Sequence, residues 1–156
     1  MATINASFSL NGDIGSYGTT AQNEMLMTRA NSTTGLDKAT GLVRKTLAST
    51  NEVDLLTVGA GLVEDVPTDK ATKVYIKNVN SDSSEFFTVG FGKSSGSSSK
   101  QAFAVTDDAN RSVELGRLYA GDFMIIPWCA ASDENDIFVK PSVATNIVIE
   151  FMVFYE

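Results

Sequence analysis

The stretch Asn146-Ile147-Val148-Ile149-Glu150-Phe151-Met152-Val153-Phe154-Tyr155 decides the fold class of this 156-residue chain. β-Branched and aromatic residues dominate it, and such residues suit a pleated surface. Side chains alternate between the two faces of a strand, and here nearly every position on both faces is apolar. A strand with two apolar faces lies in the middle of a sheet or in a subunit interface. This stretch is therefore the strongest core candidate in the sequence.

Shorter runs of the same character precede it and are bounded by turn residues, which predicts more strands. These runs are residues 42–47, 53–58, 73–79, 85–91, 113–118, 123–127 and 137–140. The runs 73–79 and 85–91 flank the turn Asn80-Ser81-Asp82-Ser83-Ser84, and we expect them to pair as a hairpin. No stretch longer than about ten residues shows uninterrupted apolar spacing of the helical kind.

Roughly eight to ten strands at this spacing are typical of a sandwich or barrel. We predict an all-β fold, an antiparallel β-sandwich of the jelly-roll type, formed by residues 42–156. Residues 1–41 are polar and are predicted to form an extended N-terminal arm with one or two strands. Within it, residues 3–10 alternate as a half-buried strand, and Asn11-Gly12-Asp13 is a strong turn signal.

Composition limits the partners of this protein. The net charge is −7, from nineteen acidic and twelve basic side chains, so the average field repels phosphate backbones and nucleic acid is not an expected partner. No window approaches the roughly 18 apolar residues of a membrane helix, and the N-terminus does not read as a signal peptide. The single cysteine, Cys129, excludes an internal disulfide framework. We expect a protein made in a cytoplasm, without a membrane partner.

The sequence offers little for catalysis. There is no histidine, which removes the usual nucleophilic triads, zinc sites and the commonest general acid or base. Carboxylates are the remaining catalytic candidates: Asp107, Asp108, Glu114, Asp122 and the run Asp133-Glu134-Asn135-Asp136. Adjacent acids in turns are usually solvated, and the run lacks the ligand spacing of a calcium loop. We therefore expect no enzyme activity, no cofactor and no metal.

The second half of the chain resembles a known group of proteins. Val74-Tyr75-Ile76-Lys77-Asn78 precedes a Ser/Asp turn, Leu115-Gly116-Arg117-Leu118-Tyr119-Ala120-Gly121-Asp122-Phe123 precedes an apolar strand that ends at Pro127, and the terminal strand follows. In this pattern the chain resembles the small β-sandwich virion proteins of tailed bacteriophages, particularly head-decoration and minor capsid proteins. The resemblance implies a non-enzymatic homo-oligomer in the virion, with a trimer favoured, that binds the major capsid protein and stabilises its lattice.

Two segments are interface candidates, the sparse apolar positions of the arm and the end of the terminal strand. The candidate residues are Ile4, Phe8, Met25, Met27, Phe151, Val153 and Tyr155. The alternative function is a carbohydrate- or receptor-binding sandwich, such as a tail-fibre or lectin-like module. There Trp128 and Tyr119 would face a ligand in a shallow groove, whereas buried aromatic residues favour the structural function.

Overall fold

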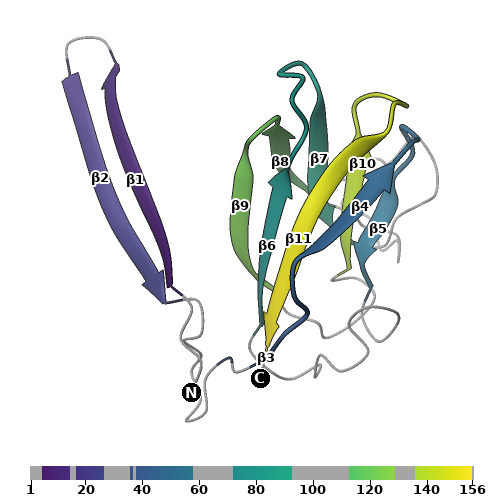
Figure 1. The fold of residues 1–156 in the computed structure, drawn as a ribbon, viewed down its shortest axis with the longest axis horizontal. Helices are drawn as coiled ribbons and strands as arrows, with labels where there is room; N and C mark the ends of the chain where they lie inside the picture. The colour runs from purple at the N-terminus through teal and green to yellow at the C-terminus, as the bar shows by residue number, and fades with distance from the viewer. Residues whose placement is uncertain are drawn as a thin grey trace, which may run out of the picture.

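The computed structural model describes residues 5–14, 17–26, 36, 38–57, 72–92, 113–128 and 136–155 (Figure 1). In these ranges every regular element is a strand. The hairpin strands are β1 (Asn5–Ile14) and β2 (Tyr17–Leu26), and the others are β3 (Lys38–Ala39), β4 (Val43–Leu47), β5 (Val53–Leu56), β6 (Thr72–Asn78), β7 (Phe86–Phe91), β8 (Val113–Tyr119), β9 (Phe123–Trp128), β10 (Ile137–Pro141) and β11 (Ile147–Tyr155). Each strand predicted between residues 42 and 155 is therefore confirmed.

The strands from β4 to β11 pair in a nested order. β4 pairs with β11, β5 with β10, β6 with β9 and β7 with β8, all antiparallel. This is one long antiparallel ribbon whose tip is β7–β8. Rolling the ribbon brings β10 beside β7 and β11 beside β6, which gives the sheet orders β5-β10-β7-β8 and β4-β11-β6-β9. The two sheets pack face to face, and the predicted jelly-roll sandwich is confirmed (Figure 1).

The predicted hairpin between residues 73–79 and 85–91 is wrong. β6 and β7 lie in different sheets, and the connection between them crosses from one layer to the other. Both strands turn alternate residues toward the same core, Val74 and Ile76 from one sheet and Phe87 and Val89 from the other. Alternation is the same for paired strands and for facing strands, so the pattern predicted the strands correctly but not their neighbours.

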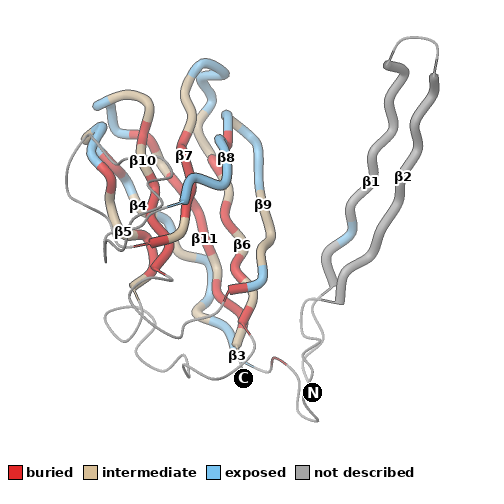
Figure 2. Tube along the Cα trace, turned by 180° about the vertical axis from the view of Figure 1, so that it is seen from behind, coloured by how far each residue is buried: buried red, intermediate tan, exposed pale blue. Residues whose placement is uncertain are grey.

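The core lies between the two sheets, and β11 supplies much of it. Ile149, Phe151 and Val153 are 0% exposed, and β11 runs between β4 and β6 in the middle of its sheet. Figure 2 shows the buried residues along β6, β7, β10 and β11. Of the two positions expected for the terminal strand, the structure shows the mid-sheet one.

The sandwich begins before residue 42. Lys38 and Ala39 of β3 pair with Tyr155 and Phe154, further along the same edge of β11 that β4 occupies. Between the two strands, the backbone N–H of Thr40 donates to the carbonyl of Val153 at 3.0 Å, and the Thr40 hydroxyl accepts from the Val153 N–H at 3.1 Å. Gly41 has a φ of 76°, which glycine adopts without strain. The expected boundary at residues 41/42 therefore falls inside a bulged edge strand.

The arm contains a long hairpin. β1 and β2 pair antiparallel from Asn5–Leu26 to Ile14–Tyr17 and form a sheet of their own. The turn expected at Asn11-Gly12-Asp13 is wrong, because these residues belong to β1 and the strand continues to Ile14. Figure 1 shows the hairpin clear of the sandwich, beyond β9.

Candidate interaction surface

Exposed apolar side chains gather along one side of the sandwich. Five large hydrophobic residues are exposed in the described part of the chain, and four of them lie on β8 and β9: Val113, Leu115, Tyr119 and Phe123. These two strands are the last strands of their respective sheets, joined by the turn at Ala120–Gly121. We call this edge of the sandwich, with its four exposed residues, the β8–β9 side. Tyr119 packs against Phe86 of one sheet and Phe123 against Tyr75 of the other, so the exposed side chains flank the edge on both faces. The fifth residue, Leu42, lies near the opposite edge, between β3 and β4.

β8 is unusually open for a strand of a sandwich. Six of its seven residues are exposed and only Leu118 enters the core, whereas the opposite edge strand of the same sheet, β5, buries Leu55 and Leu56. Its register against β7 shifts between Val89 and Gly90. Among the described strands, only β7 pairs with β8. An edge strand of this kind presents unpaired backbone groups together with apolar side chains, which is a template for another strand.

A shallow apolar hollow adjoins this edge. It has a volume of about 540 Å³ and is open to solvent; its lining residues are Leu118, Gly121, Asp122, Phe123, Met124 and Ile125. The turn beside it is held by local hydrogen bonds, since the Asp122 carboxylate accepts from the Tyr119 N–H at 2.9 Å and Gly121 has a φ of 86°. The hollow therefore lies beside a turn whose backbone is held by hydrogen bonds.

Asn78 anchors this corner from inside. It is 0% exposed, and its amide donates to the carbonyl oxygens of Leu118 at 3.0 Å and Glu85 at 3.3 Å. Its backbone adds two bonds, one to the Asp122 carbonyl at 3.0 Å and one from the Gly121 N–H at 2.9 Å. One buried side chain at the end of β6 therefore binds the last residues of β8 and the start of β7.

Replacing Asn78 with alanine should destabilise the fold by about 2 kcal/mol, because it leaves the buried Leu118 carbonyl without its side-chain donor. Thermal or urea unfolding monitored by circular dichroism measures the loss. The matched control is Ser84→Ala, at an exposed position of the same loop whose hydroxyl donates to the Asp82 carboxylate at 2.7 Å. We expect a smaller loss there; an Asn78→Ala variant as stable as the wild type would contradict the anchoring role.

The aromatic residues proposed for a ligand groove do not come together. Trp128 is 4% exposed and packs in the core, whereas Tyr119 is 42% exposed. Tyr119 instead stacks with Phe86 at a ring-centroid distance of 5.2 Å, and the Arg117 guanidinium lies 4.6 Å from the Phe86 centroid. These three residues form a small aromatic and cationic patch on the outer face of the β5-β10-β7-β8 sheet.

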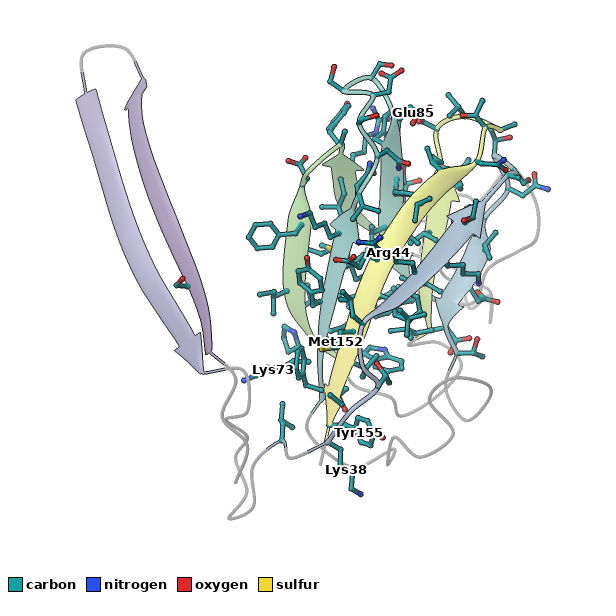
Figure 3. The ribbon with its side chains drawn as sticks, in the orientation of Figure 1. Lys38, Arg44, Lys73, Glu85, Met152 and Tyr155 are labelled. Atoms are coloured by element: carbon teal, nitrogen blue, oxygen red, sulfur yellow. The ribbon has the colours of Figure 1, made fainter. Side chains whose placement is uncertain are left out.

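The outer face of the other sheet carries a second cluster. Leu36 and Phe154 are buried there, with Tyr75, Ile125 and Met152 packed against them. The Arg44 guanidinium lies 2.9 Å from the Glu150 carboxylate, and burial together with that carboxylate raises the pKa of the Tyr75 phenol above its usual value. Figure 3 shows Arg44, Met152 and Lys73 along this face. Leu36 thus fixes the root of the arm to its own sandwich.

The interface residues expected from the sequence are scattered. Phe151 and Val153 are 0% exposed in the chain's own core, which corrects their assignment to a contact with a second chain. Tyr155 is partly buried against the same core, and the Lys38 ammonium lies 5.9 Å from its ring centroid. Phe8 lies on β1 and Met25 on β2, and their side chains are outside the description.

Ile4 and Met27 lie outside the described residues, as do Asp107, Asp108 and residues 133–135 of the acidic run. Of the other carboxylates, Glu114 lies on β8, Asp122 caps the turn, and Asp136 is buried before β10. Within the described ranges no three His, Cys, Asp or Glu side chains are grouped to hold a metal ion. No helix in those ranges is long and apolar enough to span a membrane.

Sequence reasoning missed Val113, Leu115 and Phe123 as surface residues. In the segment from Val113 to Tyr119 apolar residues fall on both faces of a strand, Val113 and Leu115 on one and Leu118 on the other, so the pattern does not show which face is buried. The signal that was present is Glu114, Gly116 and Arg117, which make this run more polar than the terminal strand.

No protein-family model and no curated protein matches the sequence. Among solved structures, a chain described with the words "Bacillus endospore appendages form a novel family of disulfide-linked pili" is similar at 9% identity and a TM-score of 0.43. The alignment covers 99% of this chain and 88% of that chain. A likeness of this strength carries no argument about function.

Proposed function

We propose that this chain is a non-enzymatic structural protein of a virus particle, of the capsid-decoration or minor-capsid type, which binds the major capsid protein and stabilises its lattice. The β8–β9 side carries the proposal, because it joins an open strand edge to exposed apolar side chains. Such a surface is suited to assembly rather than to chemistry. The phage-like pattern of residues 73–156 supplies the class of particle.

The architecture supports the same class. Jelly rolls occur in viral capsid proteins, lectins and cupins. A metal-binding cupin needs histidine ligands, and this sequence has none. A lectin-like groove needs aromatic residues exposed together, and Trp128 is buried while Tyr119 is exposed. Capsid assembly therefore remains the use of the fold that these residues favour.

Deleting residues 1–26 should abolish binding to particles while the sandwich stays folded. The deletion ends before Leu36 and β3, because both belong to the sandwich and a deletion to Gly41 would remove the partner of Phe154 and Tyr155. Co-sedimentation with purified particles measures binding, and circular dichroism verifies folding. The control carries alanine at Ser7, an exposed position, with the arm intact. Particle occupancy unchanged by the deletion would falsify the role of the arm.

The second candidate, a carbohydrate- or receptor-binding module, is favoured by one observation, the exposed stack of Tyr119, Phe86 and Arg117. Aromatic faces of this kind bind sugar rings by stacking. A wild-type chain that ignores particles but is retained on immobilised glycans, and whose Tyr119→Ala variant is not retained, would favour this module over the structural protein.

A further inference from the structure

We propose that the open edge of β8 receives the β1–β2 hairpin of a second copy of this chain. The hairpin then continues the β5-β10-β7-β8 sheet across the boundary between two subunits. The inference deepens the proposed function and rests on its structural character, but it concerns self-assembly, which is measured without any particle.

The acceptor is β8 rather than β9. Both strands end their sheets, but β9 contains Pro127, which lacks a backbone donor and marks a strand that is not extended further. β8 contains no proline, and six of its seven residues are exposed. Val113 and Leu115, at 42% and 43% exposure, then offer apolar contact to an added strand. Main-chain pairing supplies affinity and alternate side chains supply specificity in such an addition.

The donor is the hairpin because it needs a partner. An isolated two-stranded hairpin is marginally stable in water, whereas three or more strands with an apolar face are stable. The register pairs Ala6 with Met25, Phe8 with Asn23 and Leu10 with Ala21, so alternation places mainly apolar positions on one face. The intervening pairs, Ser7 with Glu24 and Ser9 with Gln22, are polar. Ten-residue strands are long enough to cover the seven residues of β8.

The geometry of the arm points to exchange between copies. Leu36, 2% exposed, holds the root of the arm against Phe154 of its own sandwich. The hairpin itself stands clear of the β8 edge of its own chain in Figure 1 and belongs to a separate sheet. Donating a hairpin to the next subunit is a heterologous contact, which closes into a ring, such as the trimer that the resemblance to virion proteins implies, or continues as a filament.

The first test measures molar mass by light scattering for the purified full-length chain alone. We expect a small closed oligomer or a filament for the wild type and a monomer for the double variant Val113→Lys, Leu115→Lys, since charged lysines on an edge strand oppose strand addition. The matched control is Leu42→Lys, an equally drastic change at a 54% exposed residue near the opposite edge, which should assemble normally. A monomeric wild type, or a Leu42→Lys variant that is monomeric as well, overturns the proposal.

The second test separates donor from acceptor. A chain without residues 1–26 keeps the β8 edge and lacks the hairpin, and the full-length Val113→Lys, Leu115→Lys chain keeps the hairpin and lacks the edge. Each should be a folded monomer alone, and a mixture should form a one-to-one heterodimer. Failure of the mixture to associate overturns hairpin exchange, whatever the chain does with particles. Loss of particle binding with heterodimer formation intact would instead contradict only the proposed function.

Discussion

Replacing Phe151 with aspartate should leave no folded protein. Phe151 is 0% exposed in the middle of β11 and faces the core between the sheets, where no water reaches the new carboxylate. Burying an unpaired charge costs several kcal/mol, and removing the ring costs about 3–5 kcal/mol more. The sum is comparable to the whole stability of a domain, about 5–15 kcal/mol. We expect a circular dichroism spectrum of unfolded chain, or loss of soluble expression.

Two further variants make the result specific. Phe151→Ala creates a cavity without a charge and should lower the free energy of unfolding by about 3–5 kcal/mol. Phe123→Asp places the same carboxylate at an apolar residue that is 48% exposed, and this variant should fold. A stable, soluble Phe151→Asp protein would show that β11 does not form the centre of the core.

Replacing Gly90 with alanine should destabilise the protein by about 3 kcal/mol or more, although only one methyl group is added. A Cβ atom at this position would overlap the Phe138 ring and the backbone carbonyl of Val113. Phe138 is 0% exposed, so the ring has no space into which to move, and the carbonyl belongs to the neighbouring strand β8. Overpacking of a filled site usually costs about 1–3 kcal/mol, and a clash with backbone lies at the upper end.

Gly116 provides the control, because it lies in β8 opposite Val89 and a Cβ atom there would meet nothing within 4 Å. Gly116→Ala should leave stability unchanged or raise it by about 0.4–1 kcal/mol, since alanine restricts the unfolded chain. Urea unfolding of both variants measures the contrast. Equal stabilities for the two variants would mean that Phe138 does not pack over Gly90.

The sequence predicted the strand β8 but not its position at the edge of a sheet. The run from Val113 to Leu118 predicted a strand, and β8 is that strand. Its edge position depends on the order of the strands, which pairs β7 with β8 and places no described strand beyond them. The exposure of Val113 and Leu115 therefore could not be inferred from the run itself.

The sequence by itself determined most of the strands, because apolar runs bounded by turn residues are local features of the chain. The apolar run ending at Tyr155 and the shorter runs before it could each be identified as a strand from their own residue types. Only the tertiary structure decided which strands are neighbours. β4 and β11 pair although about a hundred residues separate them in the sequence. β6 and β7, which are consecutive in the chain, lie in different sheets. Pairing between distant segments is a property of the whole rolled ribbon, and it places β11 in the middle of one sheet and β8 at the open edge of the other.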